Sequence, residues 1–68
     1  MTVTGSEIKA ISLGAEIEAL EAYTLSGVKA AANYGQGSEL SVRVGAGVYV
    51  VRVKAGAAVS THKVLVRP

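Results

Sequence analysis

The chain of 68 residues contains no cysteine, tryptophan or phenylalanine, and only one proline and one histidine. Without cysteine it has neither a disulfide framework nor a thiolate zinc site, two devices that commonly stabilise very small domains. A chain of this length forms one domain that buries roughly 60% of its unfolded surface, so its stability must come from packing. Its only aromatic residues are three tyrosines. We therefore expect a core of valine, isoleucine, leucine and alanine.

Charge is also scarce in this sequence. Seven basic and five acidic residues leave a net charge of +2, and no basic cluster indicates a nucleic-acid partner. No apolar run approaches the ~20 residues of a membrane-spanning helix, so we expect no membrane span. The first residues lack the basic start and apolar segment of a signal peptide. We interpret the chain as a domain of a longer polypeptide rather than as a cytosolic miniprotein, for a reason given below.

The strongest structural signal is the run of residues 48–53, which lies between two glycine-containing turns. Its β-branched and aromatic composition predicts a strand. Within it, Tyr49, Val51 and Val53 share the parity that we expect to face the core, because the other parity ends in charged residues. Residues 59–67 are expected to pair with this strand and to close the sheet.

Other alternating segments predict further strands. Residues 38–44 alternate cleanly, with Leu40, Val42 and Val44 directed inward. Residues 7–13 alternate imperfectly, and a bulge would reconcile their two apolar sets. The remaining strands are expected at residues 2–4 and 28–34.

Residues 17–25 form the one ambiguous segment. Ile17, Leu20 and Ala22 have a spacing that is also compatible with a helix, and alanine and glutamate favour helices. We favour a tight turn through Ile17 followed by a strand over residues 19–25, with the helix as the alternative.

Six or seven short strands, with turn signals at intervals of roughly 8–12 residues, are typical of an all-β sandwich. The sequence thus predicts one antiparallel β-sandwich domain over residues 1–68. Residues 1–5 within it are either a linker or the first edge strand.

Few residues could support chemistry. Ser60 and His62 share a face, but no carboxylate nearby in the sequence could orient the imidazole, as a catalytic triad requires. The acidic cluster of Glu16, Glu18 and Glu21 alternates with apolar residues, as a solvated strand face does, rather than forming a metal site. Gly45 and Gly47 lack the third glycine and the helix of a dinucleotide loop. We predict no catalytic residue, no cofactor and no metal ion.

The basic residues gather in the second half of the chain. If the strands around them pair as expected, four of these residues share one positive outer face. Such a face either protects a sheet edge and keeps the protein soluble, or docks an acidic partner. The four residues are Arg52, Lys54, Lys63 and Arg67.

Four segments, in this order and at this spacing, resemble the type A C-terminal sorting domain of the type IX secretion system of Bacteroidetes. They are residues 20–27, 38–42, 46–53 and 62–67. The resemblance implies a small Ig-like or fibronectin-like antiparallel β-sandwich of six to seven strands that catalyses nothing. It also implies a cargo domain on the N-terminal side of this domain, which is our reason for expecting a longer polypeptide.

The implied role is a secretion signal. The domain would direct its cargo through the periplasm and across the outer membrane, to the cell surface or the medium, and a surface sortase would then remove the domain. The implied partners are the outer-membrane shuttle protein, the translocon and the sortase. Lack of cysteine suits passage through an oxidising periplasm.

The resemblance also carries over to single positions. Gly45 stands where the family commonly has proline, which implies a looser turn, and Arg67 is followed by proline where the family ends in lysine. Arginine and lysine are not interchangeable at geometric sites. The implied sorting-motif residues are Gly45, Gly47, Tyr49, Val51, Arg52, Val53, Lys63, Val64, Val66 and Arg67.

Residues 59–67 form a candidate edge for docking by strand addition. Deletion of residues 63–68 is therefore expected to leave a fused cargo in the periplasm. The alternative function is a structural or carbohydrate-binding β-sandwich module of an exported enzyme. Such modules usually present a planar aromatic platform, which Tyr23, Tyr34 and Tyr49 on different strands would supply poorly. A small independent enzyme or regulator is the third reading.

Overall fold

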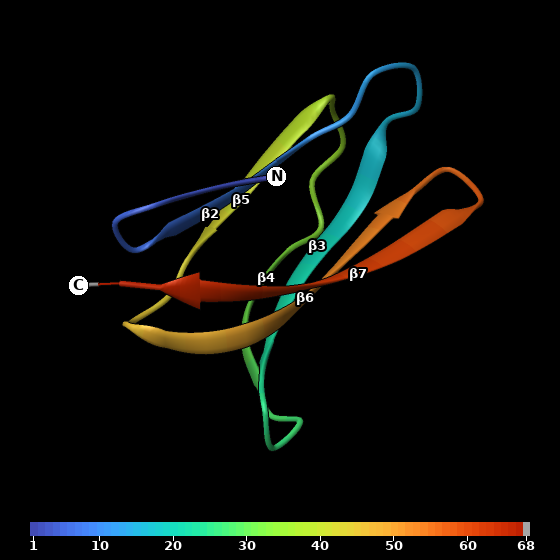
Figure 1. Ribbon diagram of the computed structural model, residues 1–68. Coiled ribbons are helices and arrows are strands. Elements are labelled where there is room, and N and C mark those ends of the chain that lie inside the picture. The colour runs from blue at the N-terminus through green and yellow to red at the C-terminus, as the bar shows by residue number, and fades with distance from the viewer. Residues whose placement is uncertain (68) are drawn as a thin grey trace.

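The computed structural model describes residues 1–67, which form seven β-strands and no helix (Figure 1). Pro68, which belongs to the expected deletion, lies outside the described residues. Residues 2–4 form an edge strand rather than a linker. The strands are β1 (Thr2–Thr4), β2 (Glu7–Ile11), β3 (Ile17–Thr24), β4 (Lys29–Asn33), β5 (Glu39–Arg43), β6 (Gly47–Ala55) and β7 (Ala58–Val66).

The strands form two antiparallel sheets, with the orders β1-β2-β5 and β4-β3-β6-β7. This confirms the predicted all-β sandwich and its strand number. Strand β4 joins the sheet of β3, β6 and β7, as the fourth strand does in fibronectin-like sandwiches. In Figure 1 the smaller sheet lies across one face of the larger one, so the opposite face of the larger sheet is uncovered.

The core lies between the two sheets and is entirely aliphatic apart from Tyr49. The predicted inward parities are confirmed: Tyr49, Val51 and Val53 of β6 are buried, as are Leu40 and Val42 of β5 and Val44 just after it. The largest side chains that are buried almost completely come from β2, β3, β6 and β7. They are Ile8, Ile17, Leu20, Val51 and Val66.

The connection from β5 to β6 crosses from one sheet to the other and is held by Tyr49. Gly47 has a φ of +155°, which residues with a side chain rarely adopt. Two residues later, the Tyr49 hydroxyl donates a hydrogen bond of 2.9 Å to the Gly45 carbonyl. A tyrosine near the start of the sixth strand that bonds back to the preceding connection is a tyrosine corner, a feature of Ig-like sandwiches.

Strand β3 differs from the expectation at its start. Ile17 is fully buried and begins the strand, so the predicted turn through Ile17 and the helical alternative are both wrong. The pairing of β3 with β6 contains an irregularity between Ile17 and Ala19. A bulge of this kind adds one residue, which allows Ile17 and Leu20 to face the core although they are three positions apart. The helix-like spacing in the sequence is thus the signature of a bulge.

Strand β2 also differs from its prediction. It ends at Ile11 rather than Leu13, and its five paired positions with β5 run without a bulge. The apolar residues of opposite parity in this segment therefore have different roles. Ile8 is buried, whereas Leu13 is 97% exposed in the loop beyond the strand.

Candidate docking strand and basic face

Strand β7 is an edge strand whose only ladder partner in residues 1–67 is β6. The pairing with β6 covers all nine of its residues, from Ala58 opposite Ala55 to Val66 opposite Gly47. The residues from Ala58 to Lys63 are all exposed. The other edge of the same sheet, β4, has five residues. The longer open edge is therefore that of β7.

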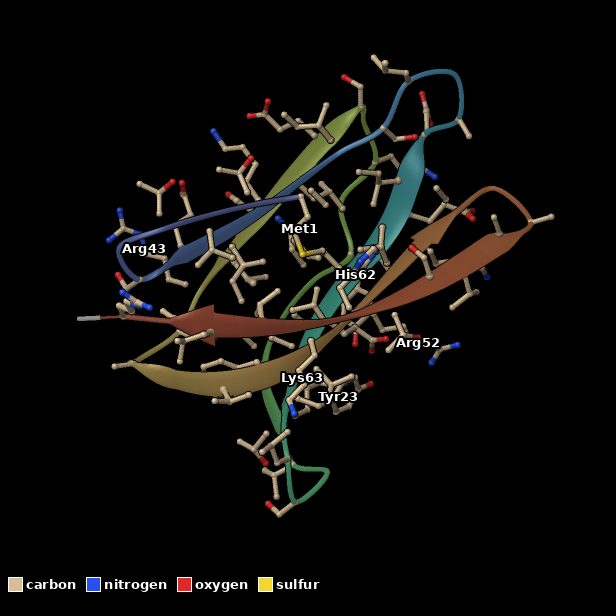
Figure 2. All side chains as sticks on the ribbon, in the orientation of Figure 1. Met1, Tyr23, Arg43, Arg52, His62 and Lys63 are labelled. Atoms are coloured by element: carbon tan, nitrogen blue, oxygen red, sulfur yellow. The ribbon has the colours of Figure 1, made fainter. Side chains whose placement is uncertain are left out.

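The strand register confirms the predicted common face for three of the four basic residues. Arg52 lies opposite Thr61, Lys54 opposite Val59, and Lys63 opposite Val50. Directly opposed residues share a sheet face, so these three cations lie on the uncovered outer face. Arg67 continues the same parity just after β7. We call Arg52, Lys54, Lys63 and Arg67 the basic face; Figure 2 shows Arg52 and Lys63 on this part of the sheet.

The residues of the implied sorting motif divide into a structural and an exposed group. Most of them build the sandwich: four are core residues, Val64 is partly buried against the core, Gly45 lies in the connection before β6, and Gly47 begins β6. The exposed side chains of the motif are Arg52, Lys63 and Arg67. A partner of the folded domain can therefore contact these three side chains, whereas the core members act through the fold. The core members are Tyr49, Val51, Val53 and Val66.

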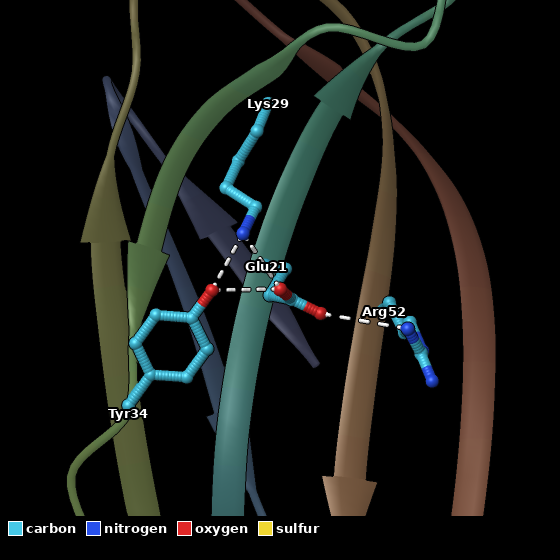
Figure 3. A network of polar contacts seen from close by, with 4 residues as sticks. All are labelled: Glu21, Lys29, Tyr34 and Arg52. Atoms are coloured by element: carbon cyan, nitrogen blue, oxygen red, sulfur yellow. Dashed lines mark hydrogen bonds and ion pairs between the residues drawn. The ribbon is translucent and has the colours of Figure 1, made fainter.

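A polar network ties β3, β4 and β6 together on the outer face (Figure 3). The Glu21 carboxylate accepts a hydrogen bond of 2.8 Å from the Tyr34 hydroxyl and lies 3.1 Å from Lys29 Nζ. Lys29 in turn donates a 2.6 Å hydrogen bond to the Tyr34 hydroxyl. The other carboxylate oxygen lies 3.8 Å from Arg52. Glu21 is 9% exposed, so the interpretation of this glutamate as part of a solvated face is wrong.

The network also uses the cation and the aromatic rings around it. Lys29 Nζ lies 6.0 Å from the ring centroid of Tyr23 and 5.4 Å from that of Tyr34, within reach of cation–π attraction. The two rings therefore flank an ammonium group, and Tyr49 is in the core. This arrangement differs from the open planar platform of a carbohydrate-binding module.

The network shifts the pKa values of Glu21 and Lys29, the two charged residues at its centre. The hydrogen bonds from Tyr34 and Lys29, in that order, lower the pKa of Glu21 from its ordinary value of 4.5. The hydrogen bonds with Tyr34 and then Glu21 raise the pKa of Lys29. Because the carboxylate is favoured in the folded state, Glu21 stabilises the fold above pH ~4.5, and this contribution is lost as the pH falls through the lowered pKa.

Replacement of Glu21 by glutamine is expected to destabilise the domain by about 1–2 kcal/mol at neutral pH, since it removes charge-assisted hydrogen bonds. The difference from the parent protein should shrink as the pH falls below about 4. Thermal unfolding across a pH series measures both effects. Glu18→Gln, at an exposed position of the same strand, is the matched control. A constant difference between the Glu21 variant and the parent at all pH values would contradict the ionic role of Glu21.

His62 and Ser60 border a groove between the two sheets. Their side chains lie 3.3 Å apart, from Nε2 to Oγ, and no carboxylate bonds to the imidazole among residues 1–67. The groove has a volume of about 160 Å³, with Ile17 and Val53 among its lining residues. Within the described part of the chain no cluster of histidine and acidic residues is arranged to hold a metal ion. Residues 1–67 also contain no helix that could cross a membrane.

Comparison of the chain with protein-family models, with curated proteins and with solved structures finds no match.

The Glu21 network and the groove were missed by sequence reasoning. The pairing of β3 with β4 shifts between Ala22 and Tyr23, which places Lys29 opposite Tyr23 on the face of Glu21. The available signal was the Ser26-Gly27 turn, which predicts a hairpin and so brings Lys29 and Tyr34 onto the strand beside Glu21. The groove depends on how the two sheets are offset, for which the sequence carries no local signal.

Proposed function

We propose that this domain is a non-catalytic secretion signal of the type IX kind, which directs a cargo fused to its N-terminal side across the outer membrane. The proposed partners are the outer-membrane shuttle protein, the translocon and the sortase. The domain would act in the periplasm and then at the cell surface, where the sortase would remove it. The observation that carries the proposal is the open edge of β7, which bears the exposed motif residues Lys63 and Arg67.

The division of the motif into core and exposed residues supports this role. A transport tag must fold reliably, and the motif residues Tyr49, Val51 and Val66 serve that need because they are buried. A tag must also present the same surface on unrelated cargoes. An edge strand does this well, because its free backbone groups accept a partner strand without requiring a cleft.

The test is the fate of a reporter cargo fused before Met1 in a bacterium with a type IX system. The double variant Lys63→Glu/Arg67→Glu is expected to leave the cargo in the periplasm, because it reverses the charge beside the docking edge while it alters only exposed side chains. Cell fractionation measures the cargo, and thermal unfolding of the purified domain verifies that the variant folds.

The matched control places the same charge change on the other sheet. Lys9→Glu/Arg43→Glu alters β2 and β5, which lie outside the sheet that contains β7, and should leave delivery intact. Delivery at the level of the parent by both double variants would overturn the proposal. Loss of delivery in both would also overturn it, because it would indicate an effect of net charge rather than of the β7 edge.

The alternative, a carbohydrate-binding or structural module, predicts no effect of the β7 charges on export. It instead predicts that an isolated domain retains binding to a polysaccharide, with Tyr23 and Tyr34 as the contact residues. Binding of insoluble polysaccharides by the domain, and its loss in Tyr34→Ala, would favour this alternative.

A further inference from the structure

Two hollows lie along β7, one toward each end of the strand. The first groove is the space of about 160 Å³ bordered by Ser60 and His62, with Ile17 and Val53 among its apolar lining. It opens on the side of β7 that faces the smaller sheet, because Ser60 and His62 lie opposite Val53 and Val51 of the core. Figure 2 shows His62 in this position. A side chain that entered from the edge of β7 would therefore meet apolar walls beneath a polar rim.

The second groove lies near the C-terminal end of β7. It has a volume of about 350 Å³ and is lined by Val3 and Gly5 from the region of β1, together with Leu65 and Arg67. Leu65 and Arg67 belong to the outward parity of the strand. The two hollows thus lie at different positions along β7, and Leu65 comes five positions after Ser60.

A strand added to β7 would present its side chains to the inner and outer faces of the sheet in alternation, because successive residues of a strand point to opposite faces. Side chains on the inner face would reach the first groove. Those on the outer face would lie beside Thr61, Lys63 and Arg67. From this geometry we propose that β7 binds an extended segment of another protein, which places one apolar side chain in the first groove and acidic side chains beside Lys63 and Arg67.

Charge decides the chemistry of this segment. The outer face beside the edge carries Lys63 and Arg67, and the next strand adds Lys54. The carboxylate of Glu21 on this face is already bonded to Lys29 and Tyr34. Acidic side chains opposite these cations gain cross-strand ion pairs, whereas basic ones are repelled. The distance from Ser60 to Arg67 is about 20–24 Å at 3.3 Å per residue, so the segment spans about seven residues.

The other edge of the sheet is a poorer site for such a segment. Strand β4 is five residues long, and its Lys29 is held across the outer face by Glu21. Its residues are mostly alanine, which offers little side-chain area for cross-strand pairing. The inference rests on the proposed function only in taking β7 as the docking strand, because the geometry applies to any acidic extended partner.

The test uses the purified chain and a synthetic peptide in which glutamate alternates with leucine over the nine-residue length of β7. Peptide titration should slow hydrogen exchange of alternate β7 amides, those whose N–H groups do not bond β6, and should shift the signals of Ser60 and His62. A peptide of the same composition with all glutamates in one block is the control. Equal binding of both peptides would mean plain charge attraction and would overturn strand addition.

Two pairs of variants test the two contacts independently: the apolar side chain in the first groove and the acidic side chains beside Lys63. Ser60→Phe fills the first groove and should weaken binding at least about tenfold, whereas Thr61→Phe, its neighbour on the other face, should keep it within about threefold. Lys63→Glu should weaken binding more than Lys54→Glu, which lies one strand further from the edge. Binding that is unaffected by both Ser60→Phe and Lys63→Glu would refute the proposed site.

Two further outcomes have a defined meaning. In the free protein, the β7 amides that do not bond β6 should exchange quickly. If they are already protected from hydrogen exchange, and this protection falls on dilution, the edge is occupied by a second copy of the chain and the inference is wrong. Failure of the peptide experiment leaves the secretion test of Lys63 and Arg67 standing, because a folded partner can dock on the basic face without adding a strand. Conversely, peptide binding combined with normal export of the Lys63/Arg67 variant would refute the proposed function alone.

Discussion

Replacement of Leu20 by alanine is expected to remove most of the stability of the domain. Leu20 is fully buried in β3, where it pairs with both Asn33 and Val53. Truncation of a buried leucine to alanine costs about 2–5 kcal/mol, through lost transfer free energy and the cavity that remains. A chain of 68 residues has a free energy of unfolding of roughly 3–10 kcal/mol, at about 0.05–0.15 kcal/mol per residue. A single core truncation therefore brings it close to unfolding.

Leu25→Ala is the matched control, because the chemical change is identical and Leu25 is 63% exposed just beyond β3. Its effect should stay within about 0.5 kcal/mol. Urea denaturation followed by far-UV circular dichroism measures both variants. Similar losses in the two would show that Leu20 does not lie in a packed core.

Val66→Asp is expected to prevent folding, whereas Leu65→Asp should be tolerated. The two residues are neighbours on β7 and face opposite sides of the sheet: Val66 is 1% exposed and Leu65 is 52% exposed. An unpaired carboxylate in the core costs at least about 3–5 kcal/mol, which is comparable to the whole stability of so small a domain. Leu65→Asp places its charge in solvent on the outer face.

The dispersion of amide signals in a two-dimensional NMR spectrum distinguishes a folded from an unfolded chain. A well-dispersed spectrum for Val66→Asp would contradict the burial of Val66. The result also bears on the deletion of residues 63–68 expected from the sequence to block export. That deletion removes Val66 and the partly buried Val64, so a block could reflect unfolding instead of lost docking. The charge variants at Lys63 and Arg67 avoid this ambiguity.

Period-two alternation allowed much of the fold to be predicted from the sequence. It placed Tyr49, Val51 and Val53 inward correctly, because a central strand buried on one face imposes a strict parity. It failed at Ile17, where the bulge changes the parity within the strand. Local propensity does not encode such an irregularity, because the bulge depends on the burial of both Ile17 and Leu20 in the core of the folded domain.

The candidate site was predictable to a lesser extent. The shared face of Arg52, Lys54 and Lys63 followed from parity and from the expected pairing of the last two strands. The groove beside Ser60 and His62 did not, because it results from the offset between two sheets that the sequence does not specify. The contact of Glu21 with Lys29 likewise depends on a register shift between β3 and β4.

The two sheets differ in how far apart along the chain their paired strands lie. The hairpin of β6 and β7 joins neighbouring strands, with Ala55 opposite Ala58, and such hairpins form in about 1–10 μs. The smaller sheet instead pairs Ala10 with Leu40, so a long intervening segment must be ordered first. All-β domains dominated by such distant pairings fold in milliseconds to seconds. The proposed docking edge of β7 can therefore form early, before the strands of the smaller sheet have found their distant partners.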